Sequence, residues 1–191
     1  IVDDFSTDST RDILKKLEGK YKIFYNERNK GKGASVISGL KKATGDILLI
    51  QDADLEYDPK DYPKLIGPII SKECEVVYGS RLLKPQFKER DLHYIGNKIL
   101  SFVTTILYFR KLTDMETGYK VFTKKVLNEI NLKSKRFDLE PEITAKIIKK
   151  KYRIKEVPIS FSPRTFKDGK KITWRDGIKH IYYLIKYRVI D

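Results

Sequence analysis

One stretch decides the fold: Gly45-Asp46-Ile47-Leu48-Leu49-Ile50-Gln51-Asp52-Ala53-Asp54. Residues 47–50 form an apolar run that is too short for a typical helix and is rich in β-branched side chains, so it predicts a buried parallel strand. Such a strand delivers Asp52 and Asp54 to its carboxyl end. Open α/β sheets bind ligands at that edge, and carboxylates there suit a hard divalent cation. A solvated acidic turn is the alternative for this pair alone.

Strand-like and helix-like segments alternate along the rest of the chain. Further strand patterns occur at residues 22–25 and 75–79, with stretches of helical apolar spacing between the strands. This alternation predicts βαβ crossovers in a mostly parallel sheet with helices on both faces. We therefore expect a single α/β domain over residues 1–191.

Helix boundaries are marked by local signals. Ser9 and Asp12 resemble a capping box, and Asp58-Pro59 is typical of a helix start with proline in the first turn. Gly45 stands where a helix C-terminal glycine is expected.

Composition limits the classes of protein. The 191 residues are 40% hydrophobic and 35% charged, which is enough for one domain with a core. The single cysteine, Cys74, rules out an internal disulfide and makes the cytosol the default compartment. No run approaches about 18 apolar residues, so a transmembrane helix is not expected. The chain opens Ile1-Val2-Asp3-Asp4 without methionine, so we expect it to begin inside a strand.

The net charge of +14 attracts polyanions or anionic membrane surfaces, so we expect an anionic partner or surface. Nucleic acid is not expected, because no zinc-finger, helix-turn-helix or RNP pattern is present. Residues 176–190 place apolar side chains at helical spacing among lysine and arginine, and Trp174 precedes them. This pattern predicts an amphipathic helix at a lipid interface over residues 174–190, with a terminal helix docked on the sheet as the equal alternative. Residues 99–109 are also strongly apolar.

Six motifs occur in an order that resembles the family-2 glycosyltransferases. They are Val2-Asp3-Asp4 with Ser6-Thr7-Asp8, Asn29-Lys30-Gly31-Lys32-Gly33, Asp52-Ala53-Asp54, Gly79-Ser80-Arg81, Thr113-Asp114-Met115-Glu116-Thr117-Gly118-Tyr119-Lys120 and Phe137-Asp138-Leu139-Glu140. The branch that they resemble is that of the dolichol-phosphate (polyprenyl-phosphate) mannose or glucose synthases. The resemblance implies the GT-A nucleotide-sugar fold. It also implies inverting, Mg²⁺- or Mn²⁺-dependent transfer of one sugar from a UDP- or GDP-sugar to a polyprenyl phosphate, by a peripheral enzyme at the cytoplasmic face of a membrane.

The resemblance assigns the donor to residues near the amino terminus. Asp4 matches the aspartate that accepts a hydrogen bond from the nucleobase, although a loop carboxylate that caps the next helix has the same spacing. Gly31 lets the backbone approach a phosphate or nucleoside closely, with Lys32 nearby as a point charge. Relatives carry a further strand before the position of Ile1, and we expect that the chain lacks it through truncation.

The metal is assigned to Asp52, Asp54 and Glu56, which would hold a cation that bridges the donor diphosphate. Relatives often have glutamine at the third position, so Glu56 binds the ion either directly or through water.

Arg81 matches an arginine that the family uses on phosphate, a role suited to a planar fork, with a surface salt bridge as the alternative. Arg164 and Lys171 fill the place of a second basic element near the acceptor phosphate. Asp114 is the position of a general base for a hydroxyl acceptor, whereas a lipid phosphate is already ionised and would leave Asp114 to orient the sugar. The expected catalytic residues are thus Asp54, Arg81 and Asp114. Asp138 and Glu140 either hold the far wall of the cleft or cap the helix that Pro141 begins.

The sequence leaves two other functions open. The enzymatic rival is transfer to a carbohydrate hydroxyl, although processive synthases are disfavoured because Thr173 precedes Trp174 where their Gln-x-x-Arg-Trp signature has arginine. A sugar nucleotidyltransferase is disfavoured because its glycine-rich signature is absent. The rival of another class is a basic module that binds nucleic acid or anionic lipid without catalysis.

Overall fold

The computed structural model describes residues 1–83, 92–136, 138–164 and 174–190. The chain divides into two compact units: Ile1–Thr44 with Leu132–Leu139, and Gly45–Asn131 with Glu140–Asp191. Each unit has its own internal structure. The expected single domain over residues 1–191 stays a prediction.

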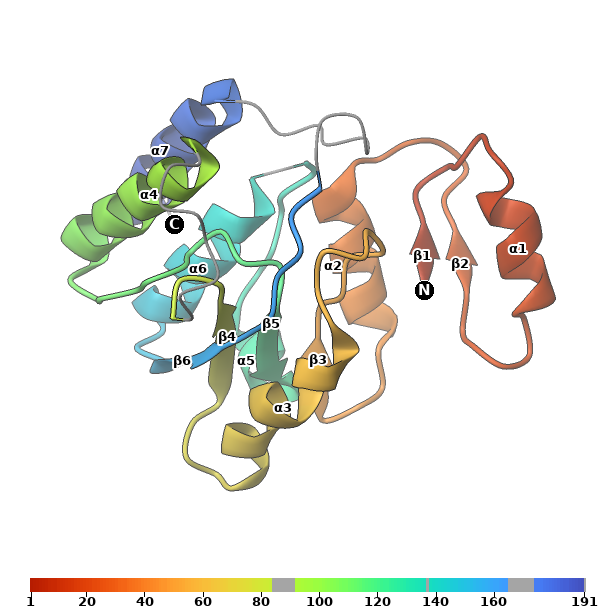
Figure 1. The fold of residues 1–191 in the computed structure, drawn as a ribbon, viewed down its shortest axis with the longest axis horizontal. Helices are drawn as coiled ribbons and strands as arrows, with labels where there is room; N and C mark the ends of the chain where they lie inside the picture. The colour runs from red at the N-terminus through yellow and green to blue at the C-terminus, as the bar shows by residue number, and fades with distance from the viewer. Residues whose placement is uncertain (84–91, 137, 165–173, 191) are drawn as a thin grey trace. The chain divides into compact units, whose positions relative to one another are not determined.

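The first unit is built on two short parallel strands, β1 (Val2–Asp3) and β2 (Phe24–Tyr25). Helix α1 (Thr10–Lys16) connects them, and α2 (Lys32–Lys42) follows β2, as Figure 1 shows. The βα alternation that the sequence predicts is therefore present in this unit.

A partly buried ion pair connects α1 to these strands. The Arg11 Nε donates to Oδ2 of Asp3 at 2.7 Å, and its Nη2 donates to the carbonyl of Asn26 at 2.6 Å. The Arg11 guanidinium also lies 4.9 Å from the centre of the Phe5 ring. Because Asp3 is 4% exposed, this pairing supplies the counter-charge that a buried carboxylate requires.

The second unit contains a four-stranded sheet. Its order is β3 (Ile47–Leu49), β5 (Lys120–Thr123), β4 (Val76–Ser80) and β6 (Ile154–Pro158). Strand β5 is antiparallel to both β3 and β4, and β6 is parallel to β4. Three of the four strands therefore run in one direction, as expected, while the reversed β5 between them was not predicted from the sequence.

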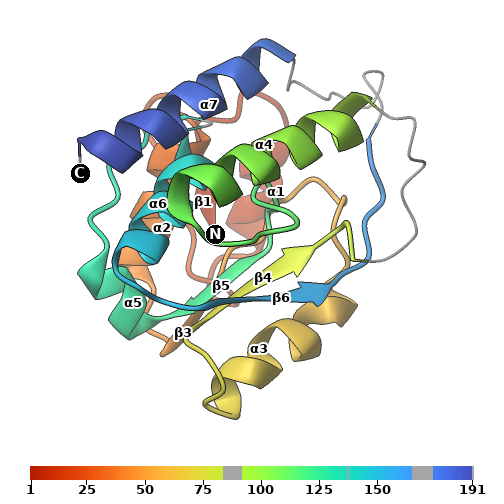
Figure 2. The ribbon, with the colours of Figure 1, turned by 90° about the vertical axis from the view of Figure 1, so that its left-hand side faces the viewer.

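Helices cover both faces of this sheet, which confirms that expectation. The 3₁₀ turn η1 (Pro59–Asp61) leads into α3 (Tyr62–Ile70), and Figure 2 shows α3 on one side of the sheet. On the other side lie α4 (Leu92–Tyr108), α6 (Leu139–Lys149) and α7 (Trp174–Val189). The short α5 (Lys124–Glu129) continues directly from β5.

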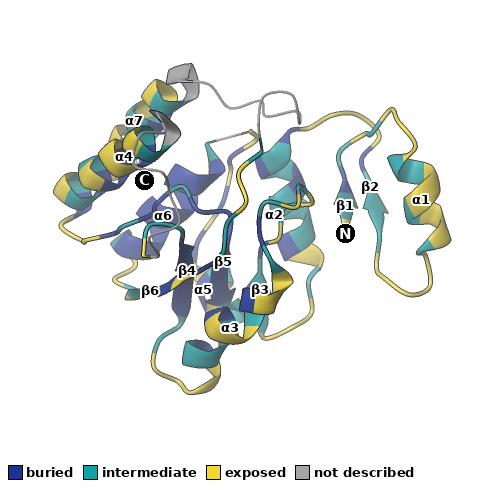
Figure 3. Ribbon diagram, in the orientation of Figure 1, coloured by how far each residue is buried: buried dark blue, intermediate teal, exposed yellow. Residues whose placement is uncertain are grey.

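Two apolar clusters belong to the core of the second unit, and Figure 3 shows β4, β5 and α6 among its most buried elements. The cluster under α3 consists of Tyr57, Leu65, Ile69, Val77, Tyr119, Val121, Val157 and Ile159. The cluster under α4, α6 and α7 consists of Leu100, Tyr108, Leu112, Met115, Ala145, Ile148, Leu184 and Tyr187. Burial of this apolar area is the main force that holds the layers together.

The local signals for helix ends had mixed outcomes. Asp58 caps η1 as predicted, since its Oδ1 accepts from the Lys60 N–H at 2.9 Å. Ser9 precedes α1, but its side chain makes no cap bond, and Asp8 accepts from the Thr10 N–H instead. The prediction for Gly45 was wrong, because the chain leaves α2 in an extended conformation at Ala43 and needs no left-handed glycine there.

Gly31 offers a test of how the first unit is packed. Its φ is +91°, and a Cβ there would lie 2.4 Å from the Lys135 carbonyl oxygen, whereas Gly19 has a similar φ of +87° and open space around it. We expect Gly31→Ala to lower the free energy of unfolding by about 2–4 kcal/mol, through backbone strain plus a forced shift of residues 135–136. Urea denaturation followed by circular dichroism measures this change.

The control is Gly19→Ala, which carries the strain without the clash and should cost only about 1 kcal/mol. Equal losses in the two variants would show that the contact with Lys135 does not restrict position 31.

Candidate active site

The acidic segment after β3 converges on one arginine. Oδ2 of Asp54 lies 3.0 Å from Nη2 of Arg164, and Oε1 of Glu56 accepts from the Arg164 backbone N–H at 3.0 Å. The Arg164 Nε lies 3.5 Å from the same Glu56 oxygen. The structure thus brings together two of the predicted metal ligands and one of the predicted phosphate ligands.

Asp52 points to a different neighbour. A Cβ on Gly118 would lie 2.9 Å from Oδ2 of Asp52 and 3.0 Å from Cε2 of Tyr57, so a side chain at position 118 would require both neighbours to shift. The Gly118 N–H donates to the Tyr57 hydroxyl at 2.9 Å. The Asp52 carboxylate therefore lies against the glycine of the 113–118 segment.

The acidic residues can be tested as a cation site by their chemistry. Carboxylate oxygens are the ligands that Mg²⁺ and Mn²⁺ prefer, and a cationic guanidinium already lies on two of the three carboxylates. Within the described ranges, no three His, Cys, Asp or Glu side chains are gathered as one ligand set. The oxygen chemistry of these side chains is thus compatible with a divalent cation, while the trio of Asp52, Asp54 and Glu56 stays a prediction.

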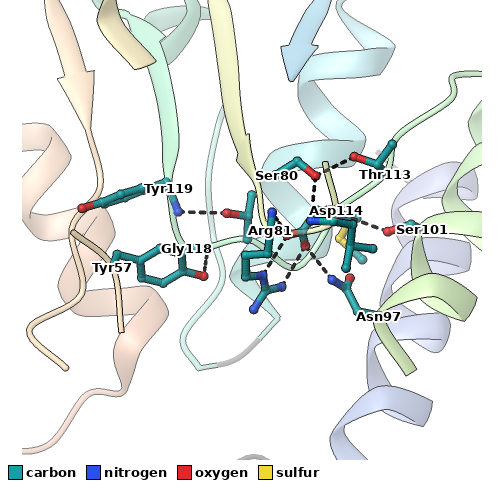
Figure 4. A network of polar contacts seen from close by, with 12 residues as sticks. Tyr57, Ser80, Arg81, Asn97, Ser101, Thr113, Asp114, Gly118 and Tyr119 are labelled. Carbon is teal, nitrogen blue, oxygen red and sulfur yellow. Dashed lines mark hydrogen bonds and ion pairs between the residues drawn. The ribbon is translucent and has the colours of Figure 1, made fainter. Parts of the chain in front are cut away.

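Arg81 lies at the end of β4 and is gripped by Asp114. The Arg81 Nε and Nη2 donate to the two oxygens of Asp114 at 2.7 and 2.8 Å, and the Arg81 backbone N–H adds a third bond at 2.9 Å. Figure 4 shows the two side chains facing each other, with Asn97 reaching the same carboxylate. The surface salt bridge considered for Arg81 is excluded, because the side chains of Arg81 and Asp114 are 15% and 0% exposed.

Asp114 is fully engaged in this network. Asn97 Nδ2 donates a fourth hydrogen bond to Oδ1 at 2.7 Å. Burial alone would raise the pKa of Asp114, but the charge and hydrogen bonds of Arg81 outweigh it and hold the pKa below its usual value. A buried carboxylate with a lowered pKa and occupied oxygens is poorly suited to remove a proton from a hydroxyl.

The 113–118 segment is held on several sides by hydrogen bonds from Glu156 and Lys120. Oε1 and Oε2 of Glu156 accept from the Thr113 N–H, and Oε1 also accepts from the Asp114 N–H. Nζ of the buried Lys120 donates to the carbonyls of Met115 and Thr117. These contacts fix the backbone that positions the Asp114 side chain.

Two helices complete the clamp. On α4, Ser101 Oγ accepts from the Met115 N–H at 3.0 Å. On α7, Nδ1 of His180 lies 2.9 Å from Oε2 of Glu116, and both side chains are largely buried. Lysine in the apolar strand pattern at 120 was a usable signal for a buried charge, but Asn97, Glu156 and His180 carry no local signal.

One short segment reaches both halves of the site. The Phe161 ring lies 5.0 Å from the Arg81 guanidinium carbon, and three residues later Arg164 contacts the acidic pair. The Ser162 N–H donates to the Glu56 carbonyl at 2.9 Å, which joins the segment to the acidic turn. The described part of the second unit therefore brings Asp54, Glu56, Arg81, Asp114 and Arg164 into one connected network.

The predicted donor residues lie in the first unit. Oδ1 of Asp4 accepts from Nδ2 of Asn26 and from the Lys30 N–H, and Oδ2 accepts from the Gly31 N–H. Burial raises the pKa of Asp4, but these hydrogen bonds outweigh it and lower the pKa. Three of about four acceptor sites are thus used within the chain, and the roles of Asp4, Gly31 and Lys32 toward a nucleotide stay predictions.

Gly31 and Gly33 pack closely against the backbone of residues 135–136. The Gly33 and Ala34 N–H groups donate to the carbonyls of Arg136 and Lys135, both at 3.1 Å. The start of α2 is therefore hydrogen-bonded to residues 135–136. This contact within the chain accounts for the close packing around the two glycines.

The remaining predicted residues are placed as follows. Oδ1 of Asp138 accepts from the Arg136 N–H at 2.9 Å, so this carboxylate stabilises its own turn. Glu140 is buried at the first turn of α6. Lys171 lies outside the described residues.

Comparison with known proteins agrees with the motif order. The model of the family "Glycosyl transferase family 2" matches residues 1–130. The chain belongs to this glycosyltransferase family. It is 36% identical to the UDP-N-acetylglucosamine–dolichyl-phosphate N-acetylglucosaminyltransferase of Methanococcus voltae, over 99% of the chain and 84% of that protein. It is 31% identical to the dolichol-phosphate mannosyltransferase of Pyrococcus furiosus, over 98% of the chain but 54% of that protein.

The fold of this transferase is the expected GT-A type. Glucosyl-3-phosphoglycerate synthase of Mycobacterium tuberculosis, crystallised with Mn²⁺, UDP-glucose and phosphoglyceric acid, superposes with a TM-score of 0.73. The match covers 100% of the chain and 68% of that protein at 16% identity. Among the helices that the structure describes, none is both long and apolar enough to span a bilayer.

The Arg81–Asp114 pair predicts a large loss of stability when one partner is removed. Asp114→Asn leaves a buried guanidinium without its counter-charge, so the free energy of unfolding should fall by about 3–5 kcal/mol in urea denaturation. Replacement of both partners, in the double variant Arg81→Met with Asp114→Leu, should recover most of that loss because no unpaired charge remains.

Asp12→Asn is the matched control, since Asp12 forms an exposed pair with Lys15 at 3.5 Å and its loss should be close to neutral. A double variant no more stable than Asp114→Asn would contradict the assigned charge pairing.

Proposed function

We propose that the chain transfers a single sugar, with inversion, from a UDP- or GDP-linked donor to a polyprenyl (dolichyl) phosphate. The acceptor would lie at the cytoplasmic surface of a membrane. Family membership favours an enzyme over a basic module without catalysis. The named relatives act on dolichyl phosphate or dolichol phosphate, and the one from Methanococcus voltae takes UDP-N-acetylglucosamine.

The proposal is supported most directly by the hydrogen bonds that the Asp114 carboxylate already accepts. A carbohydrate hydroxyl needs a base to take its proton, but both Asp114 oxygens are committed to Arg81 and Asn97. A phosphate monoester oxygen is already ionised near neutral pH and needs no base. The geometry therefore supports a phosphate acceptor over a hydroxyl acceptor.

Arg81 is the residue best placed to hold that phosphate. Asp114 fixes its guanidinium in one orientation, and Phe161 lies over one side of it. The three guanidinium N–H donors that Asp114 does not take, held in one orientation, would bind phosphate oxygens with little further loss of side-chain freedom. Asp114 then acts as the group that orients Arg81 and balances its charge.

The departing nucleoside diphosphate requires positive charge. Asp54 and Glu56, with Asp52, would hold a Mg²⁺ or Mn²⁺ ion, as the oxygen-rich donor set suits such a cation. When bound, the ion supplies electrostatic stabilisation of the leaving diphosphate. The crystallised synthase from Mycobacterium tuberculosis contains Mn²⁺ together with UDP-glucose.

Helices α4 and α7 present an apolar outer surface that suits a lipid interface. Tyr108 on α4 donates to the Leu184 carbonyl on α7 at 2.7 Å, so the two helices are joined on their inner sides. Their exposed large hydrophobic residues are Ile95, Ile99, Phe102, Ile106, Ile178, Tyr182, Ile185 and Val189. Figure 3 shows both helices with extensive exposed stretches.

Basic residues accompany this apolar surface. Lys98 and Lys179 are exposed on α4 and α7, and Lys186 and Arg188 occupy the last turn of α7. Apolar side chains that enter the headgroup region, with cations attracted to anionic lipid, are the usual basis of interfacial binding. We therefore assign this face of α4 and α7 to the membrane that carries the acceptor.

The direct test is a transfer assay. UDP- and GDP-sugars are offered with farnesyl phosphate and Mn²⁺, and the lipid products are identified by mass spectrometry. We expect one donor class to yield a sugar phosphate lipid, and the double variant Asp52→Asn with Asp54→Asn to lose at least about 100-fold in rate because the diphosphate loses its cation. Farnesol in place of farnesyl phosphate should give no product.

The same double variant serves as a control for the non-catalytic alternative. Its binding to anionic vesicles should persist or strengthen, since two negative charges are removed. Transfer to a carbohydrate hydroxyl, with no product on farnesyl phosphate from any donor, would contradict the proposal.

The membrane surface predicts a defined effect on vesicle binding. Phe102→Ser with Tyr182→Ser should weaken partitioning to vesicles that contain anionic phosphatidylglycerol by roughly tenfold or more in flotation assays, because two large apolar groups are removed. The matched control is Ile70→Ser on α3, since Ile70 and Phe102 are both 65% exposed. Equal weakening by the control would contradict the assignment of this face.

A further inference from the structure

A cation of the chain itself occupies the acidic pair predicted to hold the metal. The Arg164 guanidinium lies on Asp54 Oδ2 at 3.0 Å and near Glu56 Oε1 at 3.5 Å. The carboxylate side chains are 19% and 15% exposed, and that of Arg164 is 35% exposed. The contact is thus only partly shielded from water.

The backbone on both sides is arranged for this contact. Leu55, between the two acidic residues, has a φ of +60° and is 91% exposed. The left-handed conformation is unfavourable for a residue with a Cβ, and no burial of the Leu55 side chain compensates for it. Opposite this turn, the bridge between Tyr57 and Phe161 holds the Arg164 segment in place.

We propose that Arg164 is an exchangeable counter-cation, which neutralises Asp54 and Glu56 until a divalent cation binds them and displaces it. This inference rests on the proposed function. Displacement would free the guanidinium for an anion of the phosphate monoester class, the group that the acceptor carries.

Electrostatics explains why the two cations exclude each other. Two carboxylates two residues apart repel each other unless a positive charge lies close to both. A guanidinium and a metal ion that claim the same oxygens, Asp54 Oδ2 and Glu56 Oε1, cannot be accommodated together without strong repulsion. Arg164 therefore weakens metal binding, and by thermodynamic linkage the metal weakens the hold on Arg164.

The exchange has a functional consequence. While Arg164 is paired with the acidic residues, its charge is not available to an acceptor phosphate, and it becomes available only after the cation has bound. The arrangement favours binding of the cation and donor before the acceptor. Arg81 differs in this respect, because its partner Asp114 is buried and stays paired.

Mn²⁺ binding to the whole chain tests this exchange without reference to activity. Electron paramagnetic resonance of the free ion gives the affinity for the wild type and for Arg164→Gln, Arg164→Lys and Arg153→Gln. We expect Arg164→Gln to bind Mn²⁺ roughly three- to tenfold more tightly, since two partly exposed ion pairs no longer compete. Arg164→Lys should fall between the wild type and Arg164→Gln, because lysine keeps the charge but lacks the planar fork.

Arg153→Gln is the matched control, since Arg153 is exposed and its loss removes the same charge from the unit. Its Mn²⁺ affinity should equal that of the wild type within about twofold, because separated surface charges are screened by salt. A folding defect in Arg164→Gln would leave the comparison of Arg164→Lys with the wild type as the deciding measurement.

Two results would overturn the inference, and they differ in what they say of the proposed function. If Mn²⁺ binds the wild type and the Arg164 variants equally, the exchange is wrong while the metal site stands. If Mn²⁺ binds neither the wild type nor any variant, both the exchange and the metal-dependent part of the proposed function are wrong.

Discussion

The second unit depends on one interaction, the buried bidentate pair between Arg81 and Asp114. A guanidinium at 15% exposure is stable only with a close counter-charge, and Asp114 at 0% exposure supplies it. The surrounding polar groups maintain this pair: Asn97 binds the carboxylate from α4, and Glu156 holds the Asp114 backbone N–H from β6. The cost of these buried charges makes the orientation of Arg81 a fixed property of the fold.

The two arginines of the candidate site differ in the burial of their partners. Arg81 is paired with a buried carboxylate, whereas Arg164 is paired with the partly exposed carboxylates of Asp54 and Glu56. Phe161 and Arg164 belong to one short segment, so a single stretch of chain contacts Arg81 through its ring and the acidic turn through its cation. In the proposed reaction, Arg81 would be a fixed phosphate ligand and Arg164 an exchangeable one.

Sequence reasoning identified the family and the strands β2, β3 and β4, because ordered motifs and short apolar runs are local signals. It missed the strands β5 and β6 and the reversed direction of β5, since strand direction depends on pairings far apart in the chain. It also missed Asn97, Glu156 and His180, whose roles arise only when α4, β6 and α7 meet the 113–118 segment. Gly45 was misread because a glycine after a helix pattern does not itself require a positive φ.

Calorimetric titration of farnesyl phosphate into the wild type and Arg81→Lys, with Mn²⁺ and UDP present, tests the central claim most directly. The account predicts that Arg81→Lys binds farnesyl phosphate at least roughly tenfold more weakly, because lysine keeps the charge but not the two-oxygen grip. Farnesol, which lacks the phosphate, should bind both proteins alike. Equal affinity of the two proteins for farnesyl phosphate would contradict the role assigned to the Arg81–Asp114 pair.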